Sequence, residues 1–548
     1  MDSKKKTDVV DLKGLDVSRR TFFRGVALFG SAVVSAGLVG CGGSGNAASG
    51  SAGAVAATDG GTLNVTLSAS PKYLDPIKYT GVYESQVINN VADTLVSYKM
   101  DLSEIVPNIA TKWEISDDGL TYTFDLRDDV KFQKGEYQDG RALTADDVAY
   151  SLNRSAKESS MNRLDMLDNC EVVSDTQVKC TLKQPASSFL TALTDAGNVI
   201  VPKEEVEGWG DAFGDHLVGS GPFSLKAFTK DQQSELVRND DYWGEKPHLD
   251  GVNFKVITDT NQAANALSTG DADITTDVSG ESIQVVKDNS SLTLDQKDAL
   301  HIGYCYMNQV NGPCADQKVR KAILMAVDRD EIVKGIWQYG EGKVATLPLP
   351  KDSWGYDASV EKDVPAHDVE GAKKLIKETE LADGGKLTYY YSTSETGDKI
   401  ATILQSQLKD ALNIELEIHK SDWGTFSEAA AKGVADIYSM SWTWYPDPYF
   451  FLNKLFSSTE LGALGNGAGF SHEEVDDLLD QALAVTDQDE RAKFYKQALK
   501  KIVSYDPILV YGSRGVTTGL SNKVQGFKSR ADQLVYIVNS EVNVAKTA

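Results

Sequence analysis

The chain has 548 residues and a formal net charge of −25 at neutral pH. That length exceeds what one hydrophobic core supports, so two or three domains are expected. The acidic balance argues against nucleic acid as a partner, because proteins that bind nucleic acid need a basic surface.

The first forty residues have the pattern of an export signal. Arg19 and Arg20 form an arginine pair that is followed by an uncharged apolar stretch over 26–39. This stretch is shorter than the roughly 20 residues that span a bilayer, and small residues at its end are typical of a removable signal. The arginine pair resembles a twin-arginine translocation signal. The sequence Leu38-Val39-Gly40-Cys41 resembles the lipobox of bacterial lipoproteins, in which Cys41 would receive the lipid.

Residues 41–58 are predicted to form a flexible tether. Positions 42–57 are almost wholly Gly, Ser, Ala and Asn, a composition that cannot bury a core. Removal of residues 1–40 would take away seven basic and four acidic side chains, and the charge would become −28. No later apolar stretch reaches membrane-spanning length, so the lipid on Cys41 would be the membrane contact.

The first half of the folded part shows short strands and helices in alternation. Residues 62–67 alternate in polarity and predict a strand, and a helix is predicted near 87–96. Strands are predicted at 113–115 and 122–126. Thr144 and Asp147 form a capping-box pattern that predicts a helix reaching residue 152. Further on we expect a hairpin with its turn at 175–176, a strand at 251–256 and a helix near 261–268.

Residues 301–505 are predicted to form a further α/β unit. A strand at 387–392, an amphipathic helix over 400–412 and a strand at 414–418 make a βαβ unit, so these strands should be parallel. Helices are also predicted around 319–326 and from 472 onward. The apolar segment 508–511 is expected to be a last strand that crosses between domains.

Four cysteines remain once Cys41 is assigned to lipid. Cys170 and Cys180 flank the predicted hairpin, and Cys305 and Cys314 lie nine residues apart. In an oxidising compartment, two local disulfides are one interpretation, and four buried thiols are the other. The sequence does not fix the pairing.

Several segments together resemble one protein family. In this order and spacing, the chain resembles the extracytoplasmic solute-binding proteins of bacterial ABC transporters, family 5, the peptide/nickel group, over nearly all of its mature part. The matching segments are 74–76, 113–119 with 122–124, 143–148, 219–223, 238–244, 246–247, 250–251, 319–322, 328–329, 447–448 and 475–484. The lipoprotein-like start agrees with this resemblance independently.

The resemblance implies an α/β, two-lobed periplasmic-binding-protein-like fold of the class II type, with an extra inserted α+β domain. Lobe I would comprise 59–96, 199–300 and 509–548. The inserted domain would comprise 97–198, and lobe II would comprise 301–508. The chain would cross between the lobes near residues 300 and 508, which makes these crossings the hinge candidates.

The resemblance also implies where the ligand lies. In relatives that take peptides, the peptide is extended and pairs with short strands of the protein. The matching positions here are Val82 and Tyr83, in the stretch 81–84, then Trp442, Thr443, Trp444 and Tyr445, and finally Tyr511. Trp442, Trp444, Tyr445 and Tyr449 would supply flat walls, and we expect about half of these rings to face the cleft while the others pack in the core.

One departure from the family pattern affects the ligand. Many peptide-binding relatives carry an aspartate before the Asp-Pro pair, which holds the amino group of the peptide. The stretch 442–448 is one residue short and lacks this aspartate, and Asp447 is expected to be structural. Peptide is therefore the leading ligand class, while a hydrophobic or modified peptide, or a sugar derivative, stays open.

Other functions are less well supported by the residues. The six histidines, at 216, 248, 301, 367, 419 and 472, show no metal-ligand spacing, so no metal or cofactor is expected, although a nickel or haem complex remains an alternative ligand. The chain is not expected to be an enzyme, because it has no nucleophile elbow and no phosphate-binding loop. A structural lipoprotein would not explain the family segments. Expected partners are ABC permease subunits with a cytoplasmic ATPase, and the chain is expected to be a monomer.

Overall fold

The computed structural model describes residues 59–462 and 465–547. Arg19, Arg20 and Cys41, with the predicted export signal and tether, lie outside the described residues. Within those two ranges, no helix is both long enough and apolar enough to cross a bilayer.

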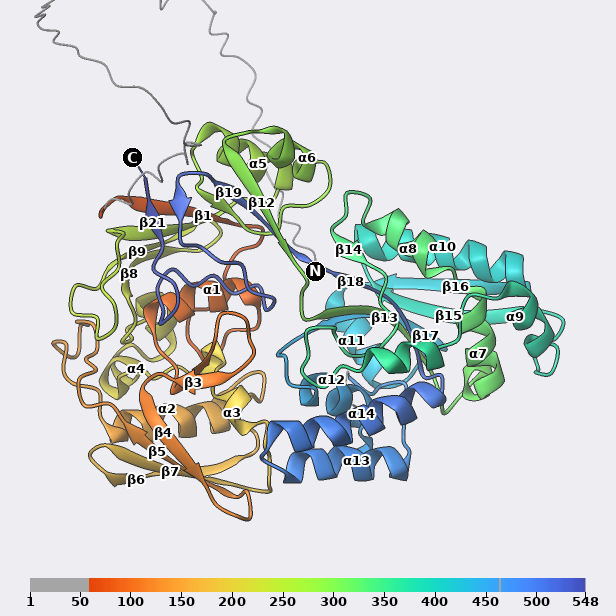
Figure 1. The fold of residues 1–548 in the computed structure, drawn as a ribbon, viewed down its shortest axis with the longest axis horizontal. Coiled ribbons are helices and arrows are strands. Elements are labelled where there is room, and N and C mark those ends of the chain that lie inside the picture. The colour runs from red at the N-terminus through yellow and green to blue at the C-terminus, as the bar shows by residue number, and fades with distance from the viewer. Residues whose placement is uncertain (1–58, 463–464, 548) are drawn as a thin grey trace, which may run out of the picture. The chain divides into compact units, whose positions relative to one another are not determined.

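A seven-stranded sheet, called here the first sheet, is assembled from separate stretches of chain (Figure 1). In spatial order its strands are β12 (Leu292–Lys297), β19 (Val516–Ser521), β11 (Ile274–Thr275), β1 (Thr62–Leu67), β10 (Gly251–Val256), β9 (Gln233–Arg238) and β8 (Phe223–Thr229). β1 is parallel to β10 and β11. Its side chains at 63, 65 and 67 are fully buried, so the strand predicted at 62–67 lies inside the sheet. The helices of this part are α1 (Val82–Val91), α4 (Lys203–Trp209), α5 (Thr260–Thr269) and α6 (Ser282–Asp288).

A six-stranded sheet, the second sheet, is built from the later part of the chain. Its strands are, in order, β14 (Gly342–Lys343), β18 (Ile508–Arg514), β13 (His301–Met307), β17 (Ile437–Thr443), β15 (Gly385–Ser392) and β16 (Ile414–Ser421). β15 and β16 are parallel and are joined by α10 (Glu395–Leu412), which confirms the predicted βαβ unit.

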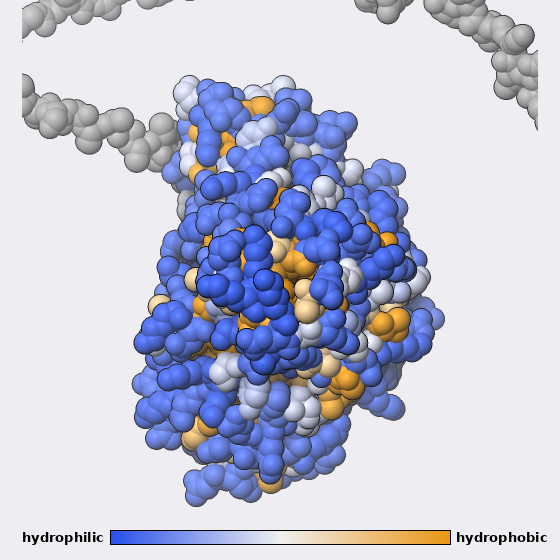
Figure 2. Space-filling model, turned by 90° about the vertical axis from the view of Figure 1, so that its right-hand side faces the viewer, coloured by the Kyte–Doolittle hydropathy of each residue, from blue (hydrophilic) through white to orange (hydrophobic). Residues whose placement is uncertain are grey.

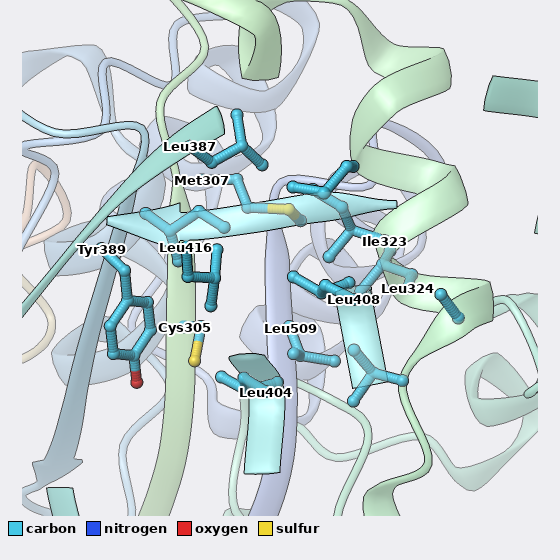
Figure 3. Packing of buried hydrophobic residues seen from close by; sticks show 14 of the residues in the cluster. Cys305, Met307, Ile323, Leu324, Leu387, Tyr389, Leu404, Leu408, Leu416 and Leu509 are labelled. Atoms are coloured by element: carbon cyan, nitrogen blue, oxygen red, sulfur yellow. The ribbon is translucent and has the colours of Figure 1, made fainter. Parts of the chain in front are cut away.

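Helices cover both faces of the second sheet. One core contains side chains from α7 (Gln317–Ala326), α8 (Arg329–Ile336), α9 (Val369–Ile376) and α10. The opposite core contains side chains from α11 (Trp423–Ala431), α12 (Tyr449–Phe456), α13 (Glu473–Ala484) and α14 (Gln488–Ser504). Successive residues of β13 alternate between these cores, because a strand sends neighbouring side chains to opposite faces. Figure 3 shows Cys305 and Met307 of β13 among leucines and isoleucine from α7 and α10.

A smaller four-stranded antiparallel sheet lies within residues 110–182. Its order is β4 (Ala110–Ile115), β5 (Thr121–Leu126), β7 (Gln177–Leu182) and β6 (Leu167–Ser174), with α2 (Ala145–Glu158) packed on it. The predicted capping box is confirmed, since the Asp147 carboxylate accepts a hydrogen bond from the backbone N–H of Thr144 (2.9 Å). The predicted hairpin is also present. β2 (Val96–Tyr98), β3 (Ile105–Pro107) and α3 (Phe189–Ala192) complete this region.

The chain passes twice between the first and second sheets. The first passage, between β12 and β13, lies at 298–300, where the sequence predicts it. The second lies at Gly515, later than the predicted position near 508, because the apolar strand β18 still pairs with β13 in the second sheet. The passages are neighbours: Lys297 pairs with Val516, and a Cβ on Gly515 would lie 2.8 Å from the carbonyl oxygen of Lys297. The other domain boundaries stay a prediction.

Short elements fill the connections. Short 3-10 helices occur at Ala196–Asn198, Gly210–His216, Pro313–Ala315, Ala358–Asp363 and Ser458–Glu460, and β20 (Val524–Gln525) pairs with β21 (Ala545–Lys546). Figure 2 shows one face of the molecule, which is mainly hydrophilic, with apolar residues in small scattered groups. Scattered apolar residues are normal on a soluble surface, so this face by itself indicates no docking site.

Candidate ligand-binding cleft

Three hollows lie between the first and second sheets and share lining residues. The aromatic hollow, of about 480 Å³, is lined by the stretch 441–445 and by α1 from its first residue. The polar hollow, of about 810 Å³, is lined by Asp277, His301 and Arg514 among others. The inner hollow, of about 230 Å³, contains residues of both. Because Val82 and Ser441 line the aromatic and inner hollows, and Arg514 lines the inner and polar hollows, the three form one cleft.

The aromatic wall is formed where β17 leaves the second sheet. The strand is buried over 437–439, and from Ser441 onward its side chains are exposed or half-buried. Trp442 donates its indole N–H to the carbonyl oxygen of Phe450 (2.8 Å), and its ring centroid lies 5.7 Å from that of Trp444. Tyr445 also packs edge-on against Phe450. A ring whose polar atom already has a partner presents a rigid flat surface to a ligand.

Three of the four rings predicted for this wall line the cleft. Trp442, Trp444 and Tyr445 face the aromatic hollow, with Thr443 between them, whereas Tyr449 packs against Phe450 and beneath the ammonium of Lys454. The sequence predicts that about half of the four rings face the cleft, and in the structure three of them line the aromatic hollow. Trp423, at the start of α11, was not predicted, yet it lines both the aromatic and polar hollows and is 57% exposed. Its sequence signal was a tryptophan at the first position of a capped helix.

Val82 and Tyr83 reach the cleft from a helix and not from a strand edge. The sequence predicts a helix only from about residue 87, but α1 begins at Val82, after the extended residue Gly81. The prediction started too late because the first turns of α1 are polar and yet buried. Gln86, for example, is buried and donates to the carbonyl oxygen of Gln533 (2.7 Å). Val82 and Tyr83 therefore present a helical backbone, with the extended residue Gly81 before them, and the pairing of a peptide with the stretch 81–84 stays a prediction.

Tyr511 contributes to the wall of the polar hollow from within the core. It is buried in β18, where its ring lies 6.3 Å from Trp337. Burial raises the pKa of its hydroxyl, so Tyr511 is a neutral hydrogen-bonding group at neutral pH.

Arg514 and Asp277 form an ion pair in the cleft that sequence reasoning missed. Arg514 is the last residue of β18, and Asp277 follows β11 in a left-handed conformation with φ 61°. The Asp277 carboxylate also accepts from the hydroxyl of Ser68 (3.1 Å), which is 2.8 Å from the hydroxyl of Tyr83. The available sequence signal was a lone arginine next to glycine, at the end of an apolar strand where the chain changes sheets.

His301 lies beside Arg514 and is neutral. Its Nδ1 accepts the backbone N–H of Arg514 (3.0 Å), which leaves the proton on Nε2. Burial, aided by the Arg514 charge, lowers the pKa of His301 to about 3. The polar hollow therefore gains a hydrogen-bond donor here and no second positive charge.

A second arginine–aspartate pair lies at the aromatic hollow but is closed off. The Arg163 guanidinium donates to the Asp195 carboxylate (2.7 Å) and lies 4.1 Å from the ring centroid of Tyr79. Asp195 also accepts from the Tyr79 hydroxyl and the Gly197 N–H. Both charged side chains are at least nine-tenths buried, so they build the wall.

Comparison with known proteins identifies the family. Residues 104–463 match the family model described as "Bacterial extracellular solute-binding proteins, family 5 Middle". The chain belongs to this family. The family consists of binding proteins and not of enzymes, and the two-lobed α/β fold is that of periplasmic binding proteins.

Relatives of this family 5 protein bind several kinds of solute. This chain is similar to the "Probable D,D-dipeptide-binding periplasmic protein DdpA" of Escherichia coli K12. The two are 32% identical over 482 residues, which are 85% of this chain and 91% of the relative. It resembles the solved DppA from Helicobacter pylori in complex with the peptide STSA, with TM-score 0.75 and 26% identity, over 89% of this chain and 98% of that one. It also resembles the solved AgaA from A. tumefacien R10 in complex with agropinic acid, with TM-score 0.74 and 26% identity, over 89% of this chain and 99% of that one.

Asp447 of this family 5 protein is structural, as expected from the sequence. It is buried, forms an ion pair with Arg491 (2.9 Å), and accepts the backbone N–H of Tyr449 (3.0 Å). Thr191, in α3, also donates to it (3.4 Å). Asp447 is therefore not available to the amino group of a ligand.

The four described cysteines are buried thiols in the structure. Cys170 and Cys180 are partners across β6 and β7 with their sulfur atoms 2.7 Å apart, so a disulfide there stays a prediction. Cys305 lies in β13 and Cys314 in the 3-10 helix Pro313–Ala315, and burial raises the pKa of both. A disulfide between Cys305 and Cys314 also stays a prediction of this family 5 protein. Among the residues described, no three His, Cys, Asp or Glu gather as metal ligands.

Proposed function

We propose that this chain binds a peptide in the cleft between its two sheets and passes it to the membrane permease subunits of an ABC importer. A separate cytoplasmic ATPase would supply the energy. The observation that carries the proposal is the cleft itself, with a rigid aromatic wall on the second sheet and polar groups around Asp277 and Arg514. The family and the peptide-binding relatives support it.

Closure of the cleft would use the two passages between the sheets. The passages at 298–300 and Gly515 lie side by side, so small backbone rotations there would move one sheet relative to the other. Closure would bring the aromatic wall against α1, expel water and strengthen the polar contacts of the ligand.

A non-peptide solute is the second candidate. The stretch 442–446 holds no acidic side chain, and Asp447 is engaged by Arg491. The relative that is solved with agropinic acid shows that the same fold takes other solutes. A sugar derivative, or a nickel or haem complex, would be a ligand of this second kind.

Native mass spectrometry of the full chain, purified in mild detergent without refolding, tests the proposal. A closed binding protein retains its ligand, so we expect adducts that dissociate into short peptides. One discrete non-peptide adduct would favour the second candidate. A bare mass, combined with no binding of any offered solute to the cleft, would contradict the proposal.

We further propose that lipid on Cys41 holds the protein at the outer face of the cytoplasmic membrane. The proposal rests on the lipobox-like sequence 38–41 and the Gly- and Ser-rich tether that follows it. Cells fed a labelled fatty acid should label the wild-type chain but not Cys41→Ala. Replacing Arg19 and Arg20 by lysine should block export, and normal export would contradict the twin-arginine assignment.

A further inference from the structure

The Asp277–Arg514 pair is an ion pair that a ligand can reach. The side chain of Arg514 is 36% exposed and that of Asp277 is 32% exposed, and both line the inner and polar hollows. The other arginine that lines the inner hollow, Arg530, is buried and bonded to Asp532. Arg514 is therefore the accessible guanidinium of the inner hollow.

The bonding capacity of this pair is only partly used. A guanidinium has five N–H donors, and that of Arg514 gives one hydrogen bond, to the Asp277 carboxylate, within the described residues. A carboxylate accepts at about four positions, and Asp277 accepts from Arg514 and Ser68. Donors and acceptors of opposite charge are thus left side by side on the surface of the cleft.

The pair is also held in a fixed orientation. Ser68 and the left-handed backbone of Asp277 position the carboxylate, while the bond from the backbone N–H to His301 holds the end of β18 that carries Arg514. Groups that are already ordered before binding lose little entropy when a ligand arrives. A surface ion pair without such supports would move freely.

We propose that Asp277 and Arg514 form a clamp for a zwitterionic ligand, such as an amino acid or a short peptide with both ends free. The ligand ammonium binds the Asp277 carboxylate, and the ligand carboxylate binds the free N–H groups of Arg514. A ligand with one charge would be attracted by one member of the pair and repelled by the other, whereas a zwitterion matches both.

The remainder of the ligand has a defined place. Val82 and Ser441 line both the inner and the aromatic hollow, so a side chain of the clamped ligand extends toward Trp442 and Trp444. The clamp thus predicts a peptide with an apolar or aromatic side chain next to its charged groups. This inference rests on the proposed function and narrows its ligand class.

The test compares three pools of the same dipeptides by native mass spectrometry: unmodified, N-acetylated and C-amidated. The wild-type full chain should bind the unmodified pool at least tenfold better than either capped pool. Arg514→Met should lose the discrimination against the amidated pool and keep that against the acetylated pool. Asp277→Asn should do the reverse, and asparagine tolerates the left-handed backbone at this position.

Arg238→Met is the matched control. Arg238 also lies at the end of a strand and pairs with aspartates, but it lines none of the three hollows. The Arg238→Met variant should bind all three pools as the wild-type chain does. Circular dichroism and thermal unfolding of each variant show whether it is folded, and the Arg514→Met and Asp277→Asn variants provide independent readings of the same clamp.

Any of three results would overturn the clamp. The first is equal binding of capped and unmodified pools to the wild-type chain, and the second is an Arg514→Met variant that still rejects the amidated pool. A copurified ligand that is lost in Trp442→Ala, together with no binding of the unmodified pool, would also reject the clamp while leaving the proposed function standing.

Discussion

Two arginine–aspartate pairs of this protein have the same chemistry and different surroundings. Arg491 and Asp447 are 6% and 1% exposed, whereas Arg514 and Asp277 are each about one-third exposed. Asp447 is further bonded to the Tyr449 N–H and the Thr191 hydroxyl, and Arg491 stacks on Trp354 (4.9 Å). The first pair is closed off by burial, while the second has several unused hydrogen-bonding positions that open into a cleft.

The contrast shows how burial separates structural charges from binding charges. A buried pair that loses one partner leaves an uncompensated charge in a medium that solvates it poorly. Removal of one partner from a half-exposed pair lowers the free energy of unfolding only slightly, because water solvates the charge that remains. The same substitution at the two pairs should therefore affect folding in one case and ligand selection in the other.

The largest expected effect is that of Arg491→Met on folding. Loss of the guanidinium leaves the Asp447 carboxylate buried and unpaired, which should lower the free energy of unfolding by about 3–5 kcal/mol. Urea unfolding followed by circular dichroism measures this loss. Lys501→Met is the control, because the exposed Lys501–Glu474 pair should contribute less than about 1 kcal/mol. An Arg491→Met loss no larger than that of the control would reject the structural role of this pair.

The second expected effect concerns affinity. Trp442→Ala removes a fixed wall of the aromatic hollow, and we expect the dissociation constant of the copurified ligand, or of the best-binding dipeptide, to rise more than tenfold, or about 1.4 kcal/mol. Isothermal titration calorimetry checks this value. Unlike the clamp variants, Trp442→Ala should weaken capped and unmodified peptides alike.

Tyr73→Ala controls for the loss of an aromatic ring. Tyr73 is exposed outside the three hollows, with the Lys230 ammonium over its ring. Binding by Tyr73→Ala should equal that of the wild-type chain. If Trp442→Ala also binds normally and remains folded, the aromatic hollow does not hold the ligand.

Local patterns in the sequence were enough to predict many elements of the fold. The strand at 62–67, the capping box at Thr144 and Asp147, and the parallel βαβ unit all follow from side-chain periodicity or from contacts a few residues apart. The start of α1 could not be predicted in this way. Its buried polar side chains bond to backbone carbonyls that are distant in the sequence, as Gln86 does to the carbonyl oxygen of Gln533.

The cleft could be predicted only in part for a related reason. The run of aromatic residues at 442–445 is visible as a cluster in the sequence, and the structure groups it on one wall. Asp277 and Arg514 are 237 residues apart, and nothing local marks them as partners. Their juxtaposition follows from β11 and β18 ending on the same side of the cleft, which depends on the order of strands in both sheets.

The third prediction concerns acid stability near the cleft pair. The pKa of His301 is about 3 in the folded chain and about 6.5 when unfolded, so between these values the unfolded state binds more protons. Stability should therefore fall as pH is lowered from about 6.5 toward 3, and be unaffected by this group above 6.5. His301→Gln keeps a side-chain acceptor for the Arg514 N–H and removes the titration.

Urea unfolding at pH 7 and at pH 4.5 measures this effect. The wild-type chain should lose about 1–2 kcal/mol more than His301→Gln over that interval, a value reduced from the full linkage because the ring is only partly shielded from water. Other groups titrate in the same range in both proteins, so their contributions to the stability loss cancel when the two proteins are compared. Equal losses would show that His301 is protonated freely in the folded state.

The smallest expected effect is the loss of folding stability in Arg514→Met. Water can solvate Asp277 once the guanidinium is gone, and Ser68 still donates to it, so the free energy of unfolding should change by less than about 1 kcal/mol. The double variant with Asp277→Asn completes a mutant cycle, and its coupling energy should be within the same limit. Measured beside Arg491→Met under the same conditions, this cycle sharpens the contrast between the two pairs. A coupling of several kcal/mol would mean that the cleft pair also holds the fold together, and a charge needed for folding would be less free to exchange its partner for a ligand.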